Sequence, residues 1–262
     1  MRAAGAAAWA AALPAGGEVA LVPYVMAGFP SPAATAGCLL ATQEGGAAAV
    51  ELGLPFSDPL ADGPTIQRAG QVALEQGMTV ARALGMVGEA RRAGLVIPVA
   101  TMTYLNPILQ YGPERYCGAA AAAGVDGLLV PDLPVDEAGP VAAAAAAAGL
   151  GYVTMVAPTS TPERIAAAAA LATGFVYCVA RVGVTGARAS VPPEALDLLQ
   201  RVGAVTRLPR VLGFGLSRRE HVSGLRGLAE GAVVASALLD RIGTAPDPVS
   251  ATRAAVAELA GR

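Results

Sequence analysis

The stretch VELGLPFSDPLADGPTIQRAG, Val50–Gly70, combines an apolar strand, a loop and the start of a helix. Its first residues are aliphatic apart from Glu51, and such a run is typical of a strand buried on both faces. A proline-containing loop follows, and the segment DGPTIQ, from Asp62 onward, begins a helical stretch. A strand, a loop and a helix in this order form one unit of a parallel α/β fold.

The same alternation recurs along the chain. Strands are predicted at 19–26, 48–53, 97–102, 126–131, 151–156, 174–180, 210–214 and 231–235. Helices are predicted at 32–44, 79–93, 114–123, 136–148, 162–171, 193–205, 217–228 and 247–260. Eight strand–helix pairs predict an α/β fold, a (β/α)8 TIM barrel, with residues 1–262 as a single domain; a doubly wound sheet is the alternative.

Local signals refine this division of the chain. Thr161 before Pro162 predicts a helix N-cap, and Ser217 with Glu220 predicts a capping box. The alanine-rich start, 1–14, has one arginine and no leucine-rich core, so it predicts a short N-terminal amphipathic helix rather than a signal peptide.

Composition narrows the class of protein. The net charge is −2 and no basic stripe is present, which argues against a nucleic-acid binder. No apolar run predicts a membrane span. Cys38, Cys117 and Cys178 are scattered and odd in number, which indicates reduced thiols in a cytoplasmic protein.

Two residue types are scarce in a way that limits the chemistry. All 18 basic residues are arginine, and His221 is the only histidine. Without a lysine amine, Schiff-base aldolase and pyridoxal-phosphate catalysis are excluded. One imidazole does not furnish the ligands of a zinc-dependent aldolase. Carboxylates, hydroxyls, backbone amides and arginine remain.

The barrel fold gives the acids of the opening stretch a location. In such barrels the site lies at the carboxyl ends of the strands, where Glu51, Asp58 and Asp62 fall. Aliphatic surroundings raise the pKa of Glu51, which suits a group that both donates and accepts a proton. The structural alternatives are an arginine-paired acid for Glu51, a helix cap for Asp62 and a fixed turn for Asp58.

Small-residue loops follow the last three predicted strands, at 181–190, 213–217 and 233–239. Barrels bind phosphate on the loops after strands seven and eight, so these loops predict a phosphate site, with ordinary tight turns as the alternative. Aromatic residues also fall at predicted strand ends, where they either pack in the core or line a pocket: Tyr24, Phe29, Tyr104, Tyr177 and Phe214.

The segment ELGLPFSDPLADGPTIQ resembles the signature of the tryptophan synthase α subunit family. The segments YVMAGFPS, MTYLNPILQYG, GVDGLLVPDLPVDE, GVTGAR and GFGLS extend the resemblance over nearly the whole chain. That family is a (β/α)8 barrel that cleaves indole-3-glycerol phosphate to indole and glyceraldehyde 3-phosphate. The resemblance implies a retro-aldol reaction without metal or other cofactor.

Site residues follow from the resemblance, position by position. Glu51 matches the catalytic glutamate, Asp62 the aspartate that accepts the indole N–H, and Tyr177 a tyrosine near the reacting centre. Thr185 matches a threonine in the loop that closes over the site. The indole pocket is matched by Tyr24, Ile66, Met102, Leu129 and Phe214. The phosphate loops are matched by Gly186, Gly215, Ala235 and Ser236.

The family usually acts in an α2β2 complex, so the resemblance implies a β-subunit partner. The matching contact residues are Pro55, Asp58, Asn106 and Pro107. A stand-alone lyase that releases indole and a weakly catalytic subunit that activates a β chain are the alternatives. Ala180, Val182 and Ala235 depart from the family pattern around the phosphate loops, where Ala235 replaces a usual glycine. Pro131 departs from it at the edge of the pocket.

Overall fold

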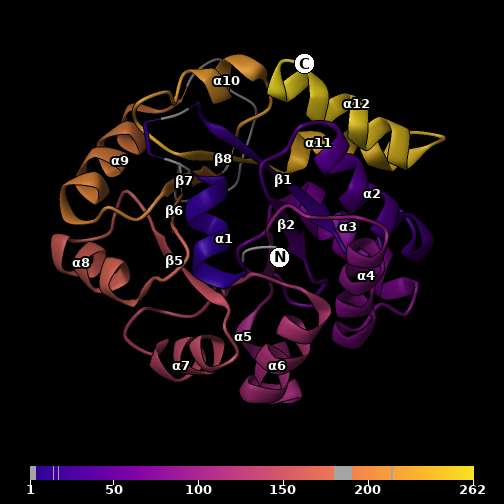
Figure 1. Cartoon of the computed structure of the whole chain (residues 1–262), viewed down its shortest axis with the longest axis horizontal. Coiled ribbons are helices and arrows are strands. Elements are labelled where there is room, and N and C mark those ends of the chain that lie inside the picture. Colours follow the sequence, from indigo (N-terminus) through magenta and orange to yellow (C-terminus); the bar gives the residue numbers. More distant parts are fainter. Residues whose placement is uncertain (1–3, 14, 17, 180–190, 214) are drawn as a thin grey trace.

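The computed structural model describes residues 4–13, 15–16, 18–179, 191–213 and 215–262. Figure 1 looks down the molecule and shows the strands in the centre with the helices arranged around them. Eight parallel strands, each paired with the next, close into a barrel when β8 pairs with β1. The predicted (β/α)8 fold is confirmed, and the doubly wound alternative is wrong.

The strands match the predicted ones but are shorter at several ends. They are β1 (Ala20–Met26), β2 (Val50–Gly53), β3 (Val99–Met102), β4 (Gly127–Leu129), β5 (Gly151–Val156), β6 (Val176–Val179), β7 (Arg210–Gly213) and β8 (Gly231–Val234).

The helices include several that the sequence pattern did not predict in full. They are α1 (Gly5–Ala12), α2 (Pro32–Glu44), α3 (Pro64–Glu75), α4 (Val80–Arg92), α5 (Leu105–Tyr111), α6 (Pro113–Ala123), α7 (Gly139–Ala147), α8 (Pro162–Leu171), α9 (Pro193–Val205), α10 (Arg219–Ser223), α11 (Ser236–Thr244) and α12 (Pro248–Ala260). Neither α5 nor α11 was predicted, and α10 is much shorter than the predicted helix 217–228.

One predicted helix cap is confirmed and one is wrong. The Thr161 side chain accepts a hydrogen bond from the Arg164 N–H at the start of α8. At α10 the N-cap is Arg218, without a side-chain cap. The predicted capping box fails because the Ser217 N–H instead donates to Nδ1 of His221, at 3.2 Å.

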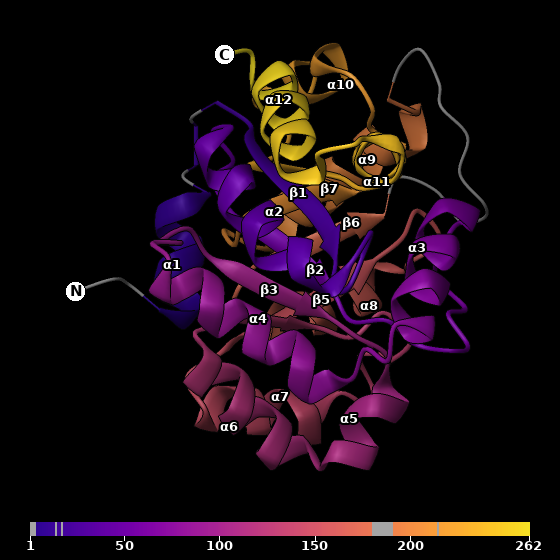
Figure 2. The same cartoon turned by 90° about the vertical axis from the view of Figure 1, so that its right-hand side faces the viewer.

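The N-terminal helix α1 closes the amino end of the barrel. In Figure 1 it lies across the middle of the ring, and Figure 2 shows it on the opposite side of the barrel from α3. Trp9 is fully buried, and its indole N–H donates to the Asp126 carbonyl at 3.2 Å. A side chain at Gly127 would strike the Trp9 ring, so glycine at the start of β4 makes room for this plug.

Two ion pairs lie at the same end of the barrel, one joining α4 to the start of β4 and one joining β7 to the start of β8. Asp126, which precedes β4, is fully buried and pairs with Arg91 at 2.7 Å. Glu230, which precedes β8, pairs with Arg210 of β7 at 2.8 Å. A buried charge is tolerated when it is paired and hydrogen-bonded, and both pairs satisfy that condition.

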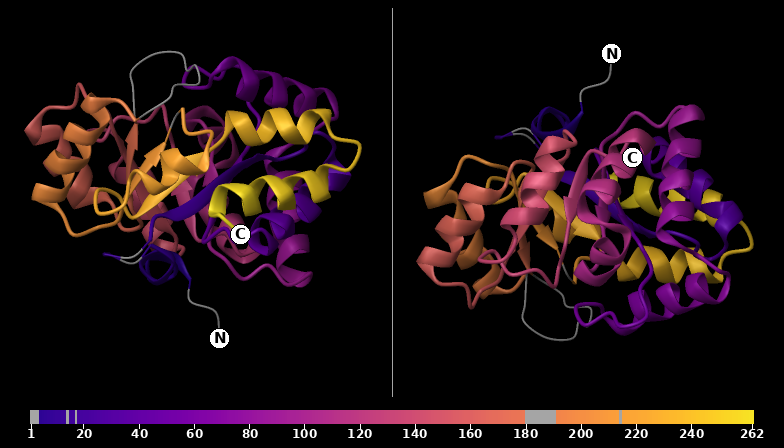
Figure 3. Two further views of the ribbon diagram at one scale, coloured as in Figure 1. Left: turned by 90° about the horizontal axis from the view of Figure 1, so that it is seen from above. Right: turned by 90° about the horizontal axis from the view of Figure 1, so that it is seen from below.

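The last helix completes the outer ring. Figure 3 shows α11 and α12 running side by side, and α12 also packs on α2. Within the described part of the chain, every helix is too short or too polar to cross a membrane.

Candidate active site

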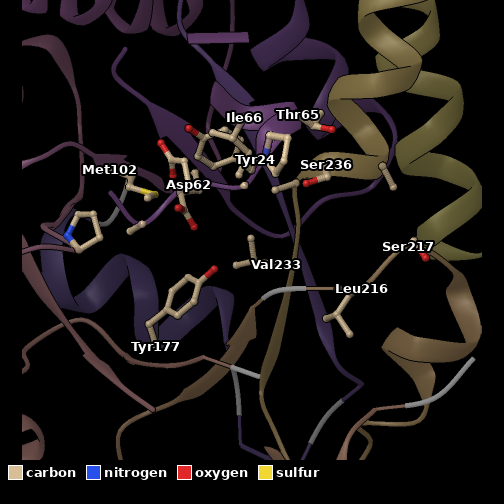
Figure 4. Close-up of a pocket in the computed structure, with 18 of the residues that line it drawn as sticks. Tyr24, Asp62, Thr65, Ile66, Met102, Tyr177, Leu216, Ser217, Val233 and Ser236 are labelled. Carbon is tan, nitrogen blue, oxygen red and sulfur yellow. The ribbon is translucent and has the colours of Figure 1, made fainter. Parts of the chain in front are cut away.

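A cavity of about 310 Å³ opens at the carboxyl end of the barrel. The inward-facing residues of most strands reach it, and the loops after β2, β7 and β8 form its rim. Its lining includes Tyr24, Glu51, Asp62, Ile66, Met102, Leu129, Pro131, Met155, Tyr177, Gly215, Val233, Ala235, Ser236 and Asp240. Figure 4 shows Asp62, Met102 and Tyr177 pointing into this space.

Glu51 lies in the middle of β2, beside Tyr24 of β1 and Ala100 of β3. Only 2% of the residue is exposed, and its Oε2 atom has no hydrogen-bond partner among the described residues. Burial, followed by the charge of Asp62, raises the pKa of Glu51 from 4.5 to about 8. Among the described ion pairs none includes Glu51, so the arginine-paired alternative finds no support there.

Asp62 approaches Glu51 from the loop before α3. The N-cap of α3 is Gly63, and the helix has no side-chain cap, so the helix-cap alternative for Asp62 is wrong. Burial raises the pKa of Asp62 from 3.8 to about 6, and a hydrogen bond with the Tyr104 side chain opposes that rise. Near neutral pH the two acids therefore differ: Glu51 is mostly protonated and Asp62 mostly ionised.

Two tyrosines reach the cavity over glycines of neighbouring strands. A side chain at Gly53, at the end of β2, would collide with the phenol of Tyr24. A side chain at Gly213, at the end of β7, would collide in the same way with Tyr177. Burial raises the pKa of both phenols well above the usual value, so both hydroxyls keep their protons.

The rim beside β7 and β8 is polar and contains backbone donors. Gly215 has φ +78°, a left-handed conformation that glycine adopts without strain. Ala235 has φ −115°, so the alanine in place of a usual glycine is not strained. Ser236 begins α11, and the N-terminus of this helix has no side-chain cap. The first backbone N–H groups of the helix are therefore available at the rim to bind an anion.

Three acids line the cavity, and among the described ion pairs only Asp240 has a counter-charge. Asp240 lines it together with Glu51 and Asp62, and no described arginine does. Asp240 accepts hydrogen bonds at its exposed edge from Arg68, at 3.2 Å, and Thr65, at 3.3 Å. Among the described residues of the lining, the groups that can bind an anion at this rim are backbone N–H groups and hydroxyls.

The four predicted partner contacts lie on the same side of the molecule as the cavity. Asp58 and Asn106 are exposed, and Pro55 and Pro107 are half-buried. The loop after β2 and the start of α5 are joined by a hydrogen bond of 3.0 Å from the Ala61 N–H to the Tyr104 hydroxyl.

Several predicted residues are not placed. Thr185, Gly186 and Phe214 lie outside the described residues, as do Ala180 and Val182. Conversely, Met155, Val233 and Asp240 line the cavity but were absent from the predicted site residues, and Pro131 lines it at the pocket edge where the resemblance put it. Met155 and Val233 lie near the ends of β5 and β8, so position at a strand end would have identified these two.

Comparison with known proteins agrees with this geometry. The family model for the tryptophan synthase alpha chain matches residues 10–261. The chain is 46% identical over 251 residues to the tryptophan synthase alpha chain of Chloroflexus aurantiacus, covering 95% of this chain and 94% of that one. It is 40% identical to the alpha chain of Bacillus pumilus, over 86% of this chain and 84% of that one.

Solved structures give the same result. A chain of the tryptophan synthase α2β2 complex from the hyperthermophile Pyrococcus furiosus has a TM-score of 0.87 and 42% identity, and the match covers 93% of this chain and 98% of that one. Tryptophan synthase subunit alpha from Legionella pneumophila has a TM-score of 0.84 at 33% identity, over 92% and 91% of the two chains. The chain therefore belongs to the tryptophan synthase alpha chain family, lyases that cleave indole-3-glycerol phosphate in tryptophan biosynthesis.

Proposed function

We propose that Glu51 and Asp62 together carry the acid–base chemistry of this lyase. The observation that supports this most strongly is a buried and a half-buried carboxylate in one cavity, with pKa values of about 8 and about 6 and no described cation beside them. Groups whose environments separate their pKa values divide naturally into an acid and an anion.

In the proposed reaction, protonated Glu51 donates its proton to C3 of the indole ring. The ring becomes a cationic indolenine, and ionised Asp62 accepts a hydrogen bond from its N–H and stabilises the charge. The Glu51 carboxylate then removes the proton of the glycerol hydroxyl next to the ring. The carbon–carbon bond breaks, its electron pair returns to the ring, and indole and glyceraldehyde 3-phosphate leave with Glu51 protonated again.

The remaining walls of the cavity suit the two ends of this substrate. Ile66, Met102 and Leu129 offer an apolar surface for the indole ring, together with the ring of Tyr24. Gly215, Ala235 and Ser236 lie at the rim, where their backbone N–H groups would bind the phosphate. Tyr177, which keeps its proton, would donate a hydrogen bond at the reacting centre.

A β-subunit partner and a cytoplasmic location belong to the same proposal. The Pyrococcus furiosus relative is part of an α2β2 complex, and the matching contact residues here border the cavity mouth. Leu60, 90% exposed, and Leu109, 54% exposed, add apolar surface on the same loop and helix. Cys38, Cys117 and Cys178 are buried and unpaired, as expected of a reducing compartment.

Indole formation from indole-3-glycerol phosphate, with and without a tryptophan synthase β subunit, tests the proposal. We expect slow release by the isolated chain and a clear increase when β is added. Fast release that β does not change supports a stand-alone lyase instead. If the wild-type chain releases no indole but still activates the β subunit, its role is that of an activating subunit and the lyase proposal is wrong.

A further inference from the structure

The side chain that contacts Asp62 from outside the cavity lining is Tyr104. It immediately precedes α5, is its N-cap residue and is 3% exposed. Its hydroxyl oxygen accepts the Ala61 N–H at 3.0 Å. Because the oxygen already accepts this bond, the phenolic proton is available for the carboxylate of the next residue, Asp62, and the Tyr104 side chain lowers the pKa of that carboxyl.

The ring of Tyr104 also holds the other end of the same loop. It lies against Phe56, with ring centroids 5.3 Å apart and planes inclined by 32°. The residues between these two attachments are largely exposed, including Asp58 and Leu60. One buried side chain from the β3 end of the barrel therefore fixes both ends of the loop that carries Asp62.

We propose that Tyr104 is the positioning residue for Asp62, holding its carboxylate toward the cavity through the hydroxyl and seating the loop through the ring. The inference rests on the proposed function, because it assigns Tyr104 a role only through the charge on Asp62.

Among the charged and titratable groups around Asp62, Tyr104 is the one that favours the ionised form of its carboxyl. Glu51, Tyr24 and Tyr177 face Asp62 from β2, β1 and β6, and Asp240 lines the same cavity from α11. The negative charges of the other carboxylates disfavour the ionised form of Asp62. The charge of Asp132 likewise disfavours ionised Tyr104 and raises the pKa of its phenol. No described cation offsets Glu51 or Asp62, and Arg68 pairs only with Asp240. The Tyr104 side chain, in contrast, lowers the pKa of Asp62.

The test is Tyr104→Phe, which removes the hydroxyl and keeps the ring against Phe56. We expect kcat to fall about 10- to 100-fold, the usual cost of losing a hydrogen bond to a charged group, with KM changed less than about threefold because the phosphate contacts lie elsewhere. The acidic limb of the kcat/KM profile should move upward from about 6, because the bond that favours the Asp62 anion is lost.

Tyr116→Phe is the matched control. Tyr116 is fully buried, and its hydroxyl bonds to Oγ1 of Thr101 at 2.9 Å, away from the cavity. Its removal should lower stability without moving the acidic limb or kcat. A structural role for Tyr104 would make the two variants alike.

Two outcomes separate the inference from the proposed function. If Tyr104→Phe keeps wild-type kcat and the wild-type acidic limb while Glu51→Gln is inactive, the positioning role is wrong and the acid–base proposal stands. If Glu51→Gln stays active, the proposed function itself fails, whatever Tyr104→Phe does.

Discussion

The two ends of the barrel treat a buried carboxylate in opposite ways. At the amino end, Asp126 is fully buried, pairs with Arg91 at 2.7 Å and accepts the Val99 N–H at 3.0 Å. At the carboxyl end, Glu51 is 2% exposed, and its Oε2 atom has no described hydrogen-bond partner. Asp126 precedes β4 and Glu51 lies in β2 of the same sheet, yet among the described ion pairs only Asp126 has a cation as partner.

This difference separates a group that holds the fold together from a group prepared for chemistry. A paired carboxylate stays ionised and joins its neighbours. An unpaired one has a raised pKa and can exchange its proton near neutral pH. Burying Glu51 without a described cation lowers the free energy of unfolding, and the packing of the rest of the barrel offsets that loss. Substitutions at the carboxyl end should therefore change mainly activity, and substitutions at the amino end mainly stability.

Glu51→Gln is expected to have the largest effect on activity. The amide keeps the shape of the side chain but cannot transfer a proton, so indole formation should fall by about 10²–10⁴-fold or more while substrate still binds. Steady-state kinetics and a binding titration with substrate measure the two quantities. Retention of more than about a tenth of wild-type rate would contradict the acid–base role.

The same variant should be more stable than wild type in alkaline solution. The pKa of Glu51 is raised in the folded state, from 4.5 to about 8. Below pH 4.5 the side chain is neutral in both the folded and the unfolded state, so its ionisation does not lower the free energy of unfolding. As pH rises from 4.5 toward 8, only the unfolded state ionises, and stability is lost. The difference in unfolding free energy between Glu51→Gln and wild type should be smallest in acid and grow to a few kcal/mol by about pH 8.

Asp126→Ala should act on stability instead. It leaves the Arg91 guanidinium, 13% exposed, without its carboxylate, and breaking a buried pair in this way costs about 3–5 kcal/mol. Urea unfolding measures the loss. The kcat of the folded fraction should stay close to wild type, and a loss of less than about 1 kcal/mol would show that the pair is dispensable.

A matched pair of glycine substitutions sharpens the contrast between the ends. Gly127→Ala meets Trp9 at the amino end, and Gly53→Ala meets Tyr24 beside Glu51. Each should cost about 1–3 kcal/mol through overpacking. Only Gly53→Ala should also lower kcat, because it displaces a ring of the cavity wall. Equal kcat values for the two variants would contradict the claim that only the carboxyl end of the barrel serves catalysis.

Ala235→Gly should have the smallest effect. Because Ala235 has φ −115°, glycine relieves no strain there, and the backbone N–H is present in either residue. We expect KM to change by less than about twofold. A large fall in KM, measured with the same substrate assay, would indicate that phosphate binding needs a backbone conformation that alanine resists.

The strands and the acids could be predicted from the sequence because each depends on a local pattern. Apolar runs located every strand, and Glu51 stood out as a charge inside one of them. The helix α11 was missed because Leu238 and Leu239 continue the apolar run of β8, and a short apolar run fits a strand or a helix. Pro107, close to the start of the short α5, resembled a loop signal.

Contacts between distant residues could not be predicted in this way. That no described arginine lines the cavity beside Glu51 is a property of the folded barrel, since 18 arginines were available in the sequence. Tyr104 was noticed as an aromatic at a strand end, but its bond to Ala61 joins residues 43 positions apart. His221 likewise replaced the expected capping box through a bond between its ring and a backbone N–H.

The ionisation of Glu51 can be measured directly by NMR, with ¹³C-labelled glutamate side chains and Glu51→Gln to assign the signal. A carboxyl buried without a cation should titrate near pH 8, well separated from the exposed glutamates. Titration near the ordinary glutamate value of 4.5 would mean that Glu51 is already a carboxylate at neutral pH. Glu51 would then lack the proton that the proposed first step requires.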